Sequence, residues 1–181
     1  MKTIKQITFV GVIAGLYTAL TLIFAPISYS YIQVRIAEAL TVLPFLTPLA
    51  IPALFIGVFL ANLFGGFGPW DWFGGSFLSL LAAVLTWLSR KLRRPWLAPV
   101  PPILLNAFGV SLYLQYMVEG FVPGLKTYLF FVVTIGIGEI IACLGLGYPL
   151  LRYLMRTNLL TRFGFAEGSG KVPDRIGETK D

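Results

Sequence analysis

The sequence predicts an all-α integral membrane protein with six transmembrane helices, the second of them short and irregular. Three observations lead to this fold class. Of the 181 residues, 57% are hydrophobic and only 12% are charged, whereas soluble domains carry about 25% charged residues. The apolar residues form runs comparable to the roughly 20 residues that a spanning helix needs. The basic residues form short clusters between these runs, which is typical of topology signals and argues against nucleic-acid binding.

The first predicted helix runs from Ile7 to about Ile27, where Pro26 and the polar sequence SYSY follow. Its basic start resembles a signal peptide, but the apolar run is long and lacks a small-x-small cleavage site, so we expect a retained helix. Small residues recur at helical spacing and would let another helix approach closely. They form two stripes, Gly11, Gly15 and Ala19 on one and Ala14 and Thr18 on the next. These stripes fit either internal packing or the docking of a partner subunit.

The second segment, Ile36 to about Leu46, meets Pro44 and Pro48. At about 1.5 Å per residue it is too short to cross a bilayer unaided, so we expect a tilted or half-buried helix sheltered by its neighbours. A third helix follows from about Leu49 to Phe64. The sequence GGFGPWDWFGG after it predicts a turn-rich loop.

Three further helices complete the predicted bundle. The fourth runs from about Phe73 to Leu88 and ends in RKLRR, and the fifth from about Pro101 to Val118. The sixth, about Lys126 to Tyr153, is interrupted by one charge, Glu139. We therefore expect a membrane domain over residues 1–157 and a flexible cytoplasmic tail over 158–181.

Six spans would place both termini on the same side of the membrane. The basic clusters all fall on that side: Lys2 and Lys5, Arg90 to Arg94, and Arg152, Arg156 and Arg162. The positive-inside rule makes it the cytoplasm, so we expect a multi-pass protein of the plasma membrane with both termini cytoplasmic. Arg35, the loop with Asp71, and Glu119 would then lie on the outer side.

Polar and aromatic residues in this apolar chain are candidates for a binding site, because charges in or beside hydrocarbon are costly. Such residues could hold a small planar ligand by stacking and by carboxylate or amide hydrogen bonds. The candidates are Arg35, Glu38, Asn62, Trp70, Asp71, Trp72, Asn106, Tyr113, Tyr116 and Glu139.

Structural roles remain open for the same residues. Arg35 and Glu38 could pair with each other, and the four aromatic residues could form an interfacial belt. Asp71 could be a turn residue, and the two asparagines could join helices by hydrogen bonds.

Catalytic chemistry is disfavoured by what the composition lacks. The chain has no histidine and one cysteine, Cys143, so neither a zinc site nor a Cys/His nucleophile pair can be assembled, and we expect no metal, cofactor or enzymatic activity. It also lacks a G-x-x-x-x-G-K-[ST] phosphate-binding loop.

The stretch VRIAEALTVLPFLTPLAIPALFIGVFLANLFGG and the six short spans resemble the QueT family, over about Ile7 to Arg156. Members of this family are substrate-binding (S) components of bacterial energy-coupling factor (ECF) transporters. The resemblance implies an ECF S-component-like bundle that captures a queuosine precursor, a deazaguanine base, from outside the cell. It also implies assembly with an ECF coupling transmembrane subunit and two ABC ATPases, which would hydrolyse the ATP.

The resemblance also implies roles for particular residues. S components present an Ala-x-x-x-Ala motif to the coupling subunit, and the nearest matches here are Ala14-x-x-x-Thr18 and Gly15-x-x-x-Ala19. For the base, Glu38 and Glu139 are the first choices to accept from its N–H and amino edge or to hold a cationic aminomethyl group, with no ranking between them. Asn62 and Asn106 would face its carbonyl side, aromatic rings would stack on it, and Arg35 would orient Glu38.

Three alternatives stay open. One is an S component for another vitamin-like solute, thiamine- or flavin-related. Another is a membrane assembly protein whose polar residues only join helices, and the weakest is a membrane enzyme.

Overall fold

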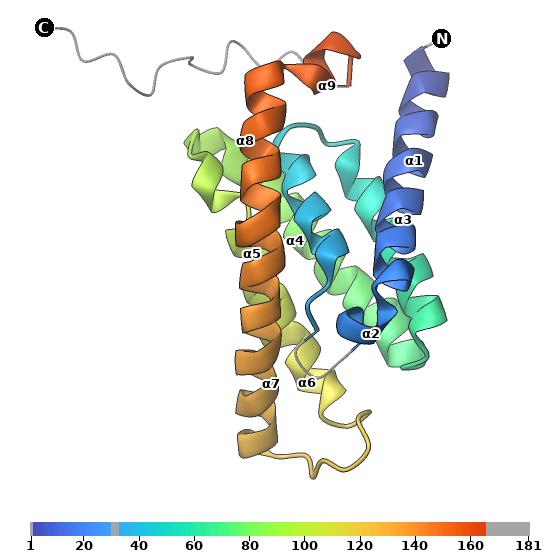
Figure 1. The fold of residues 1–181 in the computed structure, drawn as a ribbon, viewed down its shortest axis with the longest axis vertical. Helices are drawn as coiled ribbons and strands as arrows, with labels where there is room; N and C mark the ends of the chain where they lie inside the picture. The colour runs from blue at the N-terminus through green and yellow to red at the C-terminus, as the bar shows by residue number, and fades with distance from the viewer. Residues whose placement is uncertain (1, 30–32, 166–181) are drawn as a thin grey trace, which may run out of the picture.

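The described residues fold as a bundle of helices (Figure 1), whose elements form six rods in chain order. A computed structural model describes residues 2–29 and 33–165, in which every regular element is a helix. The first rod is α1 (Lys2–Ile23), followed by the short α2 (Ala25–Ser28). The second is η1 (Ile36–Phe45) and the third is α3 (Ala50–Gly65).

The last three rods are each built from several helical pieces. The fourth joins η2 (Asp71–Gly75), α4 (Ser76–Ser89) and η3 (Arg90–Leu92). The fifth joins η4 (Pro95–Leu97), α5 (Val100–Leu105), η5 (Asn106–Val110) and α6 (Ser111–Leu114). The sixth joins α7 (Leu125–Glu139), η6 (Ile140–Gly147) and α8 (Tyr148–Thr157), and α9 (Leu159–Arg162) follows it.

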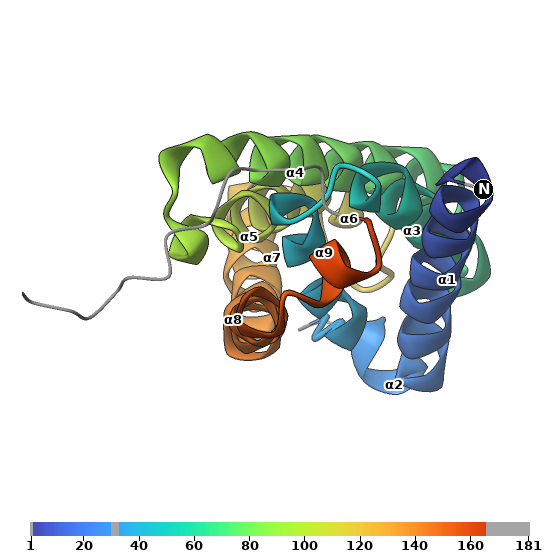
Figure 2. The same ribbon diagram turned by 90° about the horizontal axis from the view of Figure 1, so that it is seen from above.

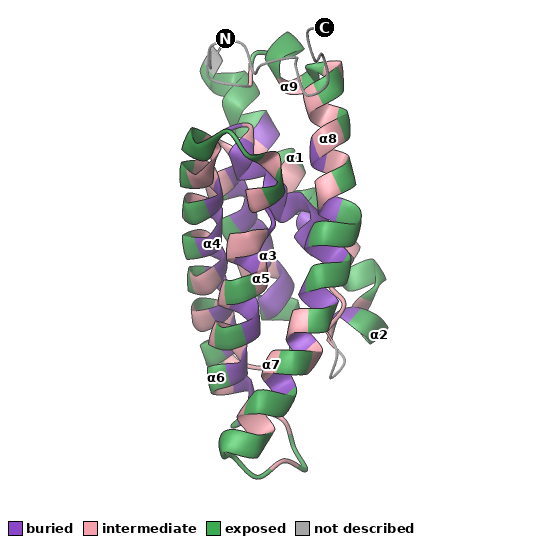
Figure 3. Cartoon of the chain, turned by 90° about the vertical axis from the view of Figure 1, so that its left-hand side faces the viewer, coloured by how far each residue is buried: buried purple, intermediate pink, exposed green. Residues whose placement is uncertain are grey.

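The predicted fold class is confirmed. Four of the rods are long and apolar enough to cross a membrane, over residues 3–23, 71–92, 95–114 and 125–157. The other two, Ile36–Phe45 and Ala50–Gly65, are shorter apolar helices. Large hydrophobic side chains are exposed around the outside of the bundle, where Figure 3 shows the exposed faces of the rods. Such a surface suits contact with lipid tails, which are as apolar as the side chains themselves.

The second rod has the short, irregular form that was expected. η1 is a 3₁₀ helix with Pro44 inside it, and nine of its ten residues, Ala37 to Phe45, are buried. It packs against η6, α4 and α1 in the middle of the bundle. Backbone that departs from the α-helix is tolerated at membrane depth when protein surrounds it in this way.

The fourth rod differs from the prediction at its start. The sequence GGFGPWDWFGG predicts a loop, but Asp71–Gly75 forms a π-helical turn that continues directly into α4. Gly66 and Gly68 do form a turn, with φ values of 81° and 90°. Gly74 and Gly75 instead lie within the π-helical turn, where Gly75 is buried. The fifth rod ends at Leu114 rather than at Val118, and the sixth extends to Thr157.

The close approach of α1 and α3 depends on small residues. A Cβ atom at Gly57 would lie 2.9 Å from the Tyr17 Cβ and 3.0 Å from the Ala14 carbonyl oxygen. Thr18 Oγ1 donates a hydrogen bond to the Gly57 carbonyl oxygen at 3.1 Å. Ala14 and Thr18 therefore serve internal packing, which was one of the two readings of the first-helix stripes.

The described ends of the chain lie together. The start of α1 and the helices α8 and α9 are at the same end of the bundle, and the turn between α6 and α7 is at the other (Figure 1). Viewed from above, α9 lies between α8 and the α1–α3 pair (Figure 2). An even number of rods produces this arrangement, as the predicted topology requires.

Candidate functional site

Seven of the ten predicted site residues come together around one buried polar cavity. These are Arg35, Glu38, Asn62, Asp71, Asn106, Tyr113 and Glu139. The remaining lining residues, which the sequence reasoning missed, are Gln33, Gly75, Ser79, Val110 and Ile135. Five of the rods, all except the first, and the segment before η1 thus contribute to the lining.

A second, wider space adjoins this cavity, and we call it the vestibule. The fifth and sixth rods line both spaces, with residues at successive helical turns. The vestibule is lined by Tyr29, Gln33, Phe67, Leu114, Met117, Val118, Glu119 and Phe131. The polar cavity is lined by Val110 and Asn106, which lie one and two helical turns before Leu114. It is also lined by Ile135 and Glu139, which lie one and two helical turns after Phe131. Asn106 and Glu139 consequently lie about 12 Å deeper than the vestibule residues.

Irregular helix occurs where the polar residues enter the cavity. One π-helical turn begins at Asp71, a second begins at Asn106, and a third begins directly after Glu139. Glu38 lies on the 3₁₀ helix η1. Insertions of this kind rotate the side chains relative to a regular α-helix and are frequent at functional sites.

At the mouth of the cavity, hydrogen bonds connect four side chains. Arg35 Nη1 donates to Asn62 Oδ1 at 3.1 Å, and Asn62 Nδ2 donates to the Asp71 carbonyl oxygen at 2.9 Å. Tyr113 donates its hydroxyl proton to Asp71 Oδ1 at 2.8 Å. The Arg35 guanidinium also lies 5.6 Å from the Tyr29 ring centroid. Arg35 therefore donates to Asn62, and its positive charge also attracts the Glu38 carboxylate. The hydrogen bond that holds this carboxylate comes from another side chain.

That side chain is Tyr17, whose hydroxyl donates to Glu38 Oε1. Tyr17 is fully buried on α1. Little in the sequence indicates this role, because a tyrosine within an apolar helix is usually accounted for by packing. Tyr17 lies three residues after Ala14 and therefore on the same side of the helix. This spacing is the one feature of the sequence that indicates a buried position for Tyr17.

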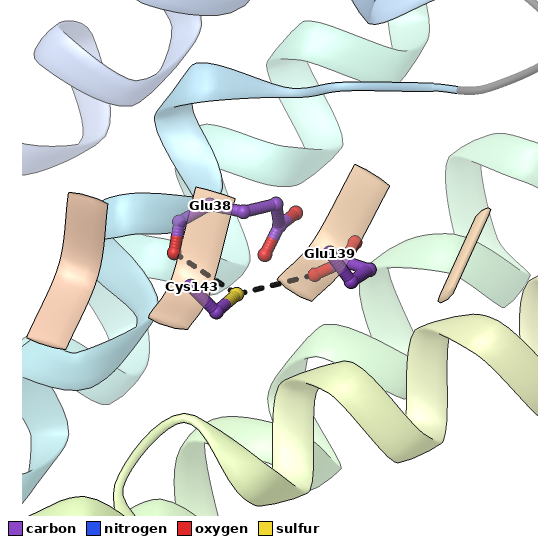
Figure 4. A group of neighbouring side chains, drawn as sticks. All are labelled: Glu38, Glu139 and Cys143. Atoms are coloured by element: carbon purple, nitrogen blue, oxygen red, sulfur yellow. Dashed lines mark hydrogen bonds between the residues drawn. The ribbon is translucent and has the colours of Figure 1, made fainter. Parts of the chain in front are cut away.

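The floor of the cavity is built around Glu139. Asn106 Nδ2 donates to Glu139 Oε1 at 2.9 Å, and the Cys143 thiol donates to Glu139 Oε2 at 3.2 Å. The Glu38 carboxylate faces the same place, as Figure 4 shows. Both oxygens of Glu139 are therefore hydrogen-bonded within the chain.

Two carboxylate oxygens in the site have no such partner. Glu38 Oε2 and Asp71 Oδ2 are buried and lack a hydrogen-bond partner among the described residues. Glu38 is 2% exposed and Asp71 is 5% exposed. Buried polar atoms are nearly always hydrogen-bonded, so an unpartnered pair beside a cavity marks the positions where a bound molecule could donate.

Three predicted site residues do not line the cavity. Trp70 and Tyr116 are 74% and 72% exposed, and Trp72 is only partly buried and also outside the lining. Trp70 and Tyr116 lie near the loop end of the bundle, as residues of an interfacial aromatic belt do. The lining residues Gly75 and Ser79 lie one and two turns after Asp71. They were missed because Asp71 was expected in the preceding loop and not on the same helix.

A family comparison now adds to this geometry. The model of the QueT transporter family matches residues 7–156, which is most of the chain. The chain belongs to the QueT transporter family. No curated protein and no solved structure matches it.

Membership confirms the resemblance noted in the sequence and identifies the chain as a membrane transporter. In this QueT transporter, the polar cavity has a volume of about 20 Å³, enough for roughly one water molecule. The vestibule has about 540 Å³. Gln33 lines both, so the two spaces adjoin. A molecule of the size of a nucleobase would require the lining side chains to move apart.

The small residues of α1 in this transporter divide into two groups. Ala14 and Thr18 face α3, as described above. Gly11, Gly15 and Ala19 are exposed, and a Cβ atom at Gly11 or Gly15 would meet nothing within 4 Å. The stripe of Gly11, Gly15 and Ala19 is therefore not used for packing within the described residues.

Proposed function

We propose that this QueT transporter is the substrate-capture (S) component of an ECF-type importer and binds a queuosine precursor, a deazaguanine base. The observation that carries the proposal is the pair of buried, unpartnered carboxylate oxygens, Glu38 Oε2 and Asp71 Oδ2, beside a polar cavity. A deazaguanine presents adjacent N–H and amino donors. A carboxylate is a strong acceptor for such donors, since charge-assisted hydrogen bonds are about twice as strong as neutral ones.

The other groups of the site complement the rest of such a base. Arg35 carries guanidinium donors beside Asn62 and could face the carbonyl oxygen of the base, and the Tyr113 ring could stack on its plane. Glu139 is already hydrogen-bonded by Asn106 and Cys143. These contacts rank Glu38 and Asp71 ahead of Glu139 for direct reading of the base edge.

Entry would take place through the vestibule. The vestibule is the larger space, is lined mainly by apolar and aromatic side chains, and lies at the loop end that carries Glu119. The positive-inside rule puts this end outside the cell, and the same argument supports a bacterial plasma membrane location with cytoplasmic termini. The solute would pass Gln33 and reach the polar cavity as its walls separate.

Calorimetry on the purified chain in detergent tests the capture function. We expect a deazaguanine to bind, and Glu38→Gln to weaken binding by about 10- to 100-fold, because a hydrogen bond to a charged group contributes about 1.5–3 kcal/mol. Lys126→Gln, at an exposed residue of the outer end that lines neither the cavity nor the vestibule, is the control and should bind as the native chain does. Binding of a thiamine- or flavin-related compound instead would leave an S component with another substrate, and no solute binding at all would favour an assembly role.

We further propose that ATP hydrolysis resides in two ABC ATPases, joined to this chain by an ECF coupling subunit. The exposed stripe of Gly11, Gly15 and Ala19 is the proposed docking face, because small residues allow close helix contact in lipid. Gly15→Leu should abolish co-purification of these subunits and spare solute binding. Gly145→Leu, on the exposed face of η6, is the control, and unchanged association of the Gly15 variant would exclude this face.

A further inference from the structure

Tyr29 lines the vestibule, and three contacts hold its side chain in place. Its hydroxyl donates to the Ala61 carbonyl oxygen at 2.6 Å. Its ring occupies a space that a glycine leaves open, since a Cβ atom at Gly65 would lie 2.5 Å from Tyr29 Cε1. The ring centroid also lies 6.1 Å from that of Phe67. The Tyr29 ring is therefore fixed against the end of α3 and the turn that follows it.

This fixed ring contacts the Arg35 guanidinium, which lines the neighbouring polar cavity. The guanidinium carbon lies 5.6 Å from the Tyr29 ring centroid, within the range of a cation–π interaction. Arg35 Nη1 also donates to Asn62 Oδ1 at 3.1 Å. Two neutral side chains, Tyr29 and Asn62, thus hold the one cationic group in the described lining of the cavity.

Two carboxylates of the same cavity attract this guanidinium but are not satisfied by it. Arg35 interacts electrostatically with both Glu38 and Asp71. Glu38 Oε2 and Asp71 Oδ2 nevertheless have no hydrogen-bond partner among the described residues. Opposite charges attract strongly in a medium of low dielectric, and the paired donors of a guanidinium match a carboxylate. Without an opposing contact, Arg35 would therefore pair with one of these carboxylates and occupy its free oxygen.

We propose that Tyr29 is a positioning residue that keeps Arg35 away from the Glu38 and Asp71 carboxylates, so that their free oxygens stay available to the solute. Tyr29 does not need to touch the solute in this role. The cost of keeping the charges apart then falls on folding and not on binding, which is a form of preorganisation. The expected effect on affinity rests on the proposed function, whereas the expected position of Arg35 does not.

The first arm of the test is calorimetry with 7-deazaguanine on the full chain in detergent. Tyr29→Leu removes the ring, and we expect affinity to fall about 10-fold or more, because the solute must then compete with Arg35 for a carboxylate. Tyr29→Phe keeps the ring beside Arg35 and should stay within about 3-fold of the native chain. Arg35→Gln should weaken binding in the native chain but strengthen it when added to Tyr29→Leu.

The second arm measures thermal unfolding without solute as a double-mutant cycle of Tyr29→Leu and Arg35→Gln. If Tyr29 only packs against Arg35, then Arg35→Gln should lower the midpoint less in the Tyr29→Leu chain than in the native chain. If Tyr29 restrains Arg35, the arginine of the Tyr29→Leu chain pairs with a buried carboxylate. Arg35→Gln should then lower the midpoint more in that chain, because it breaks a buried ion pair.

A larger loss of midpoint in the Tyr29→Leu chain supports the positioning role, and an equal or smaller loss overturns it. Native affinity in Tyr29→Leu would also overturn it and leave the proposed function standing. If 7-deazaguanine does not bind the native chain, the proposed function fails for this base, and the unfolding cycle alone decides on Tyr29. Should Tyr29→Leu not fold, Gly65→Ala takes its place in both arms, because its added methyl group displaces the same ring.

Discussion

Gly75 shows at the scale of a single residue how tightly the mouth of the cavity is built. It lies one turn after Asp71 in the π-helical turn η2. A Cβ atom there would lie 2.7 Å from Asn62 Nδ2, 3.0 Å from the Tyr113 hydroxyl oxygen and 3.3 Å from Asp71 Oδ1. Glycine at this position therefore allows three polar side chains to meet.

We predict that Gly75→Ala lowers solute affinity by about 10-fold or more, because Asn62 and Tyr113 must move away from Asp71. The Tyr113 hydrogen bond to the Asp71 carboxylate alone is of a kind that contributes about 1.5–3 kcal/mol. Gly74→Ala is the matched control, since its Cβ atom would be 3.7 Å from the nearest Tyr113 ring atom, an ordinary contact. Calorimetry on both variants gives the comparison. Equal affinities would contradict the assignment of Asn62, Asp71 and Tyr113 to the site.

At the scale of elements, the pairing of α1 with α3 holds Tyr17 in position beneath Glu38. Gly57 permits the close approach, and Tyr17, Leu54, Val58 and Ala61 belong to the same buried cluster. A shift of α1 would therefore also move the hydroxyl that donates to Glu38 Oε1.

Gly57→Ala is accordingly expected to destabilise the protein by about 1–3 kcal/mol, because the added methyl group overpacks a tight interface. Gly11→Ala, with nothing within 4 Å of its Cβ position, should be neutral or slightly stabilising, since alanine favours helix. Thermal unfolding of the two variants in the same detergent measures the difference. A Gly57 variant as stable as the Gly11 variant would show that the interface tolerates more separation than the contacts indicate.

The irregular helical turns explain why the site was only partly predictable. The rarity of charged and amide residues in an apolar chain identified six lining residues, because burying such groups in a membrane costs free energy and so favours a functional role. The π-helical turns at Asp71 and Asn106 depend on packing between rods, which no local pattern in the sequence reveals. They explain why η2 was mistaken for a loop and why Gly75 and Ser79 were missed.

At the scale of the whole molecule, hydrophobic run length and basic clusters were sufficient to predict the bundle. Both follow from the bilayer itself, whose thickness sets the length of the helices and whose two faces sort the basic residues. The roles of Trp70 and Tyr116 were not predictable in the same way. Aromatic residues at a membrane boundary and aromatic residues in a pocket have the same sequence signature, and only exposure separates them.

The predicted orientation can be tested with single cysteines in the native chain, whose own Cys143 is fully buried and serves as the unlabelled control. Glu119→Cys should react with a membrane-impermeant maleimide on intact cells. Lys91→Cys, in the basic cluster, should react only after the cells are permeabilised. The reverse pattern would invert the topology and place the vestibule in the cytoplasm.

The central claim is that the buried carboxylates around this cavity capture a deazaguanine base. The most direct measurement is mass spectrometry of small molecules that co-purify with the chain when it is expressed in cells supplied with queuosine precursors. We predict a deazaguanine at close to one molecule per chain in the native protein, and its loss in Glu38→Gln. A native protein that purifies with a different solute, or that retains the deazaguanine when Glu38 is replaced, would contradict this claim.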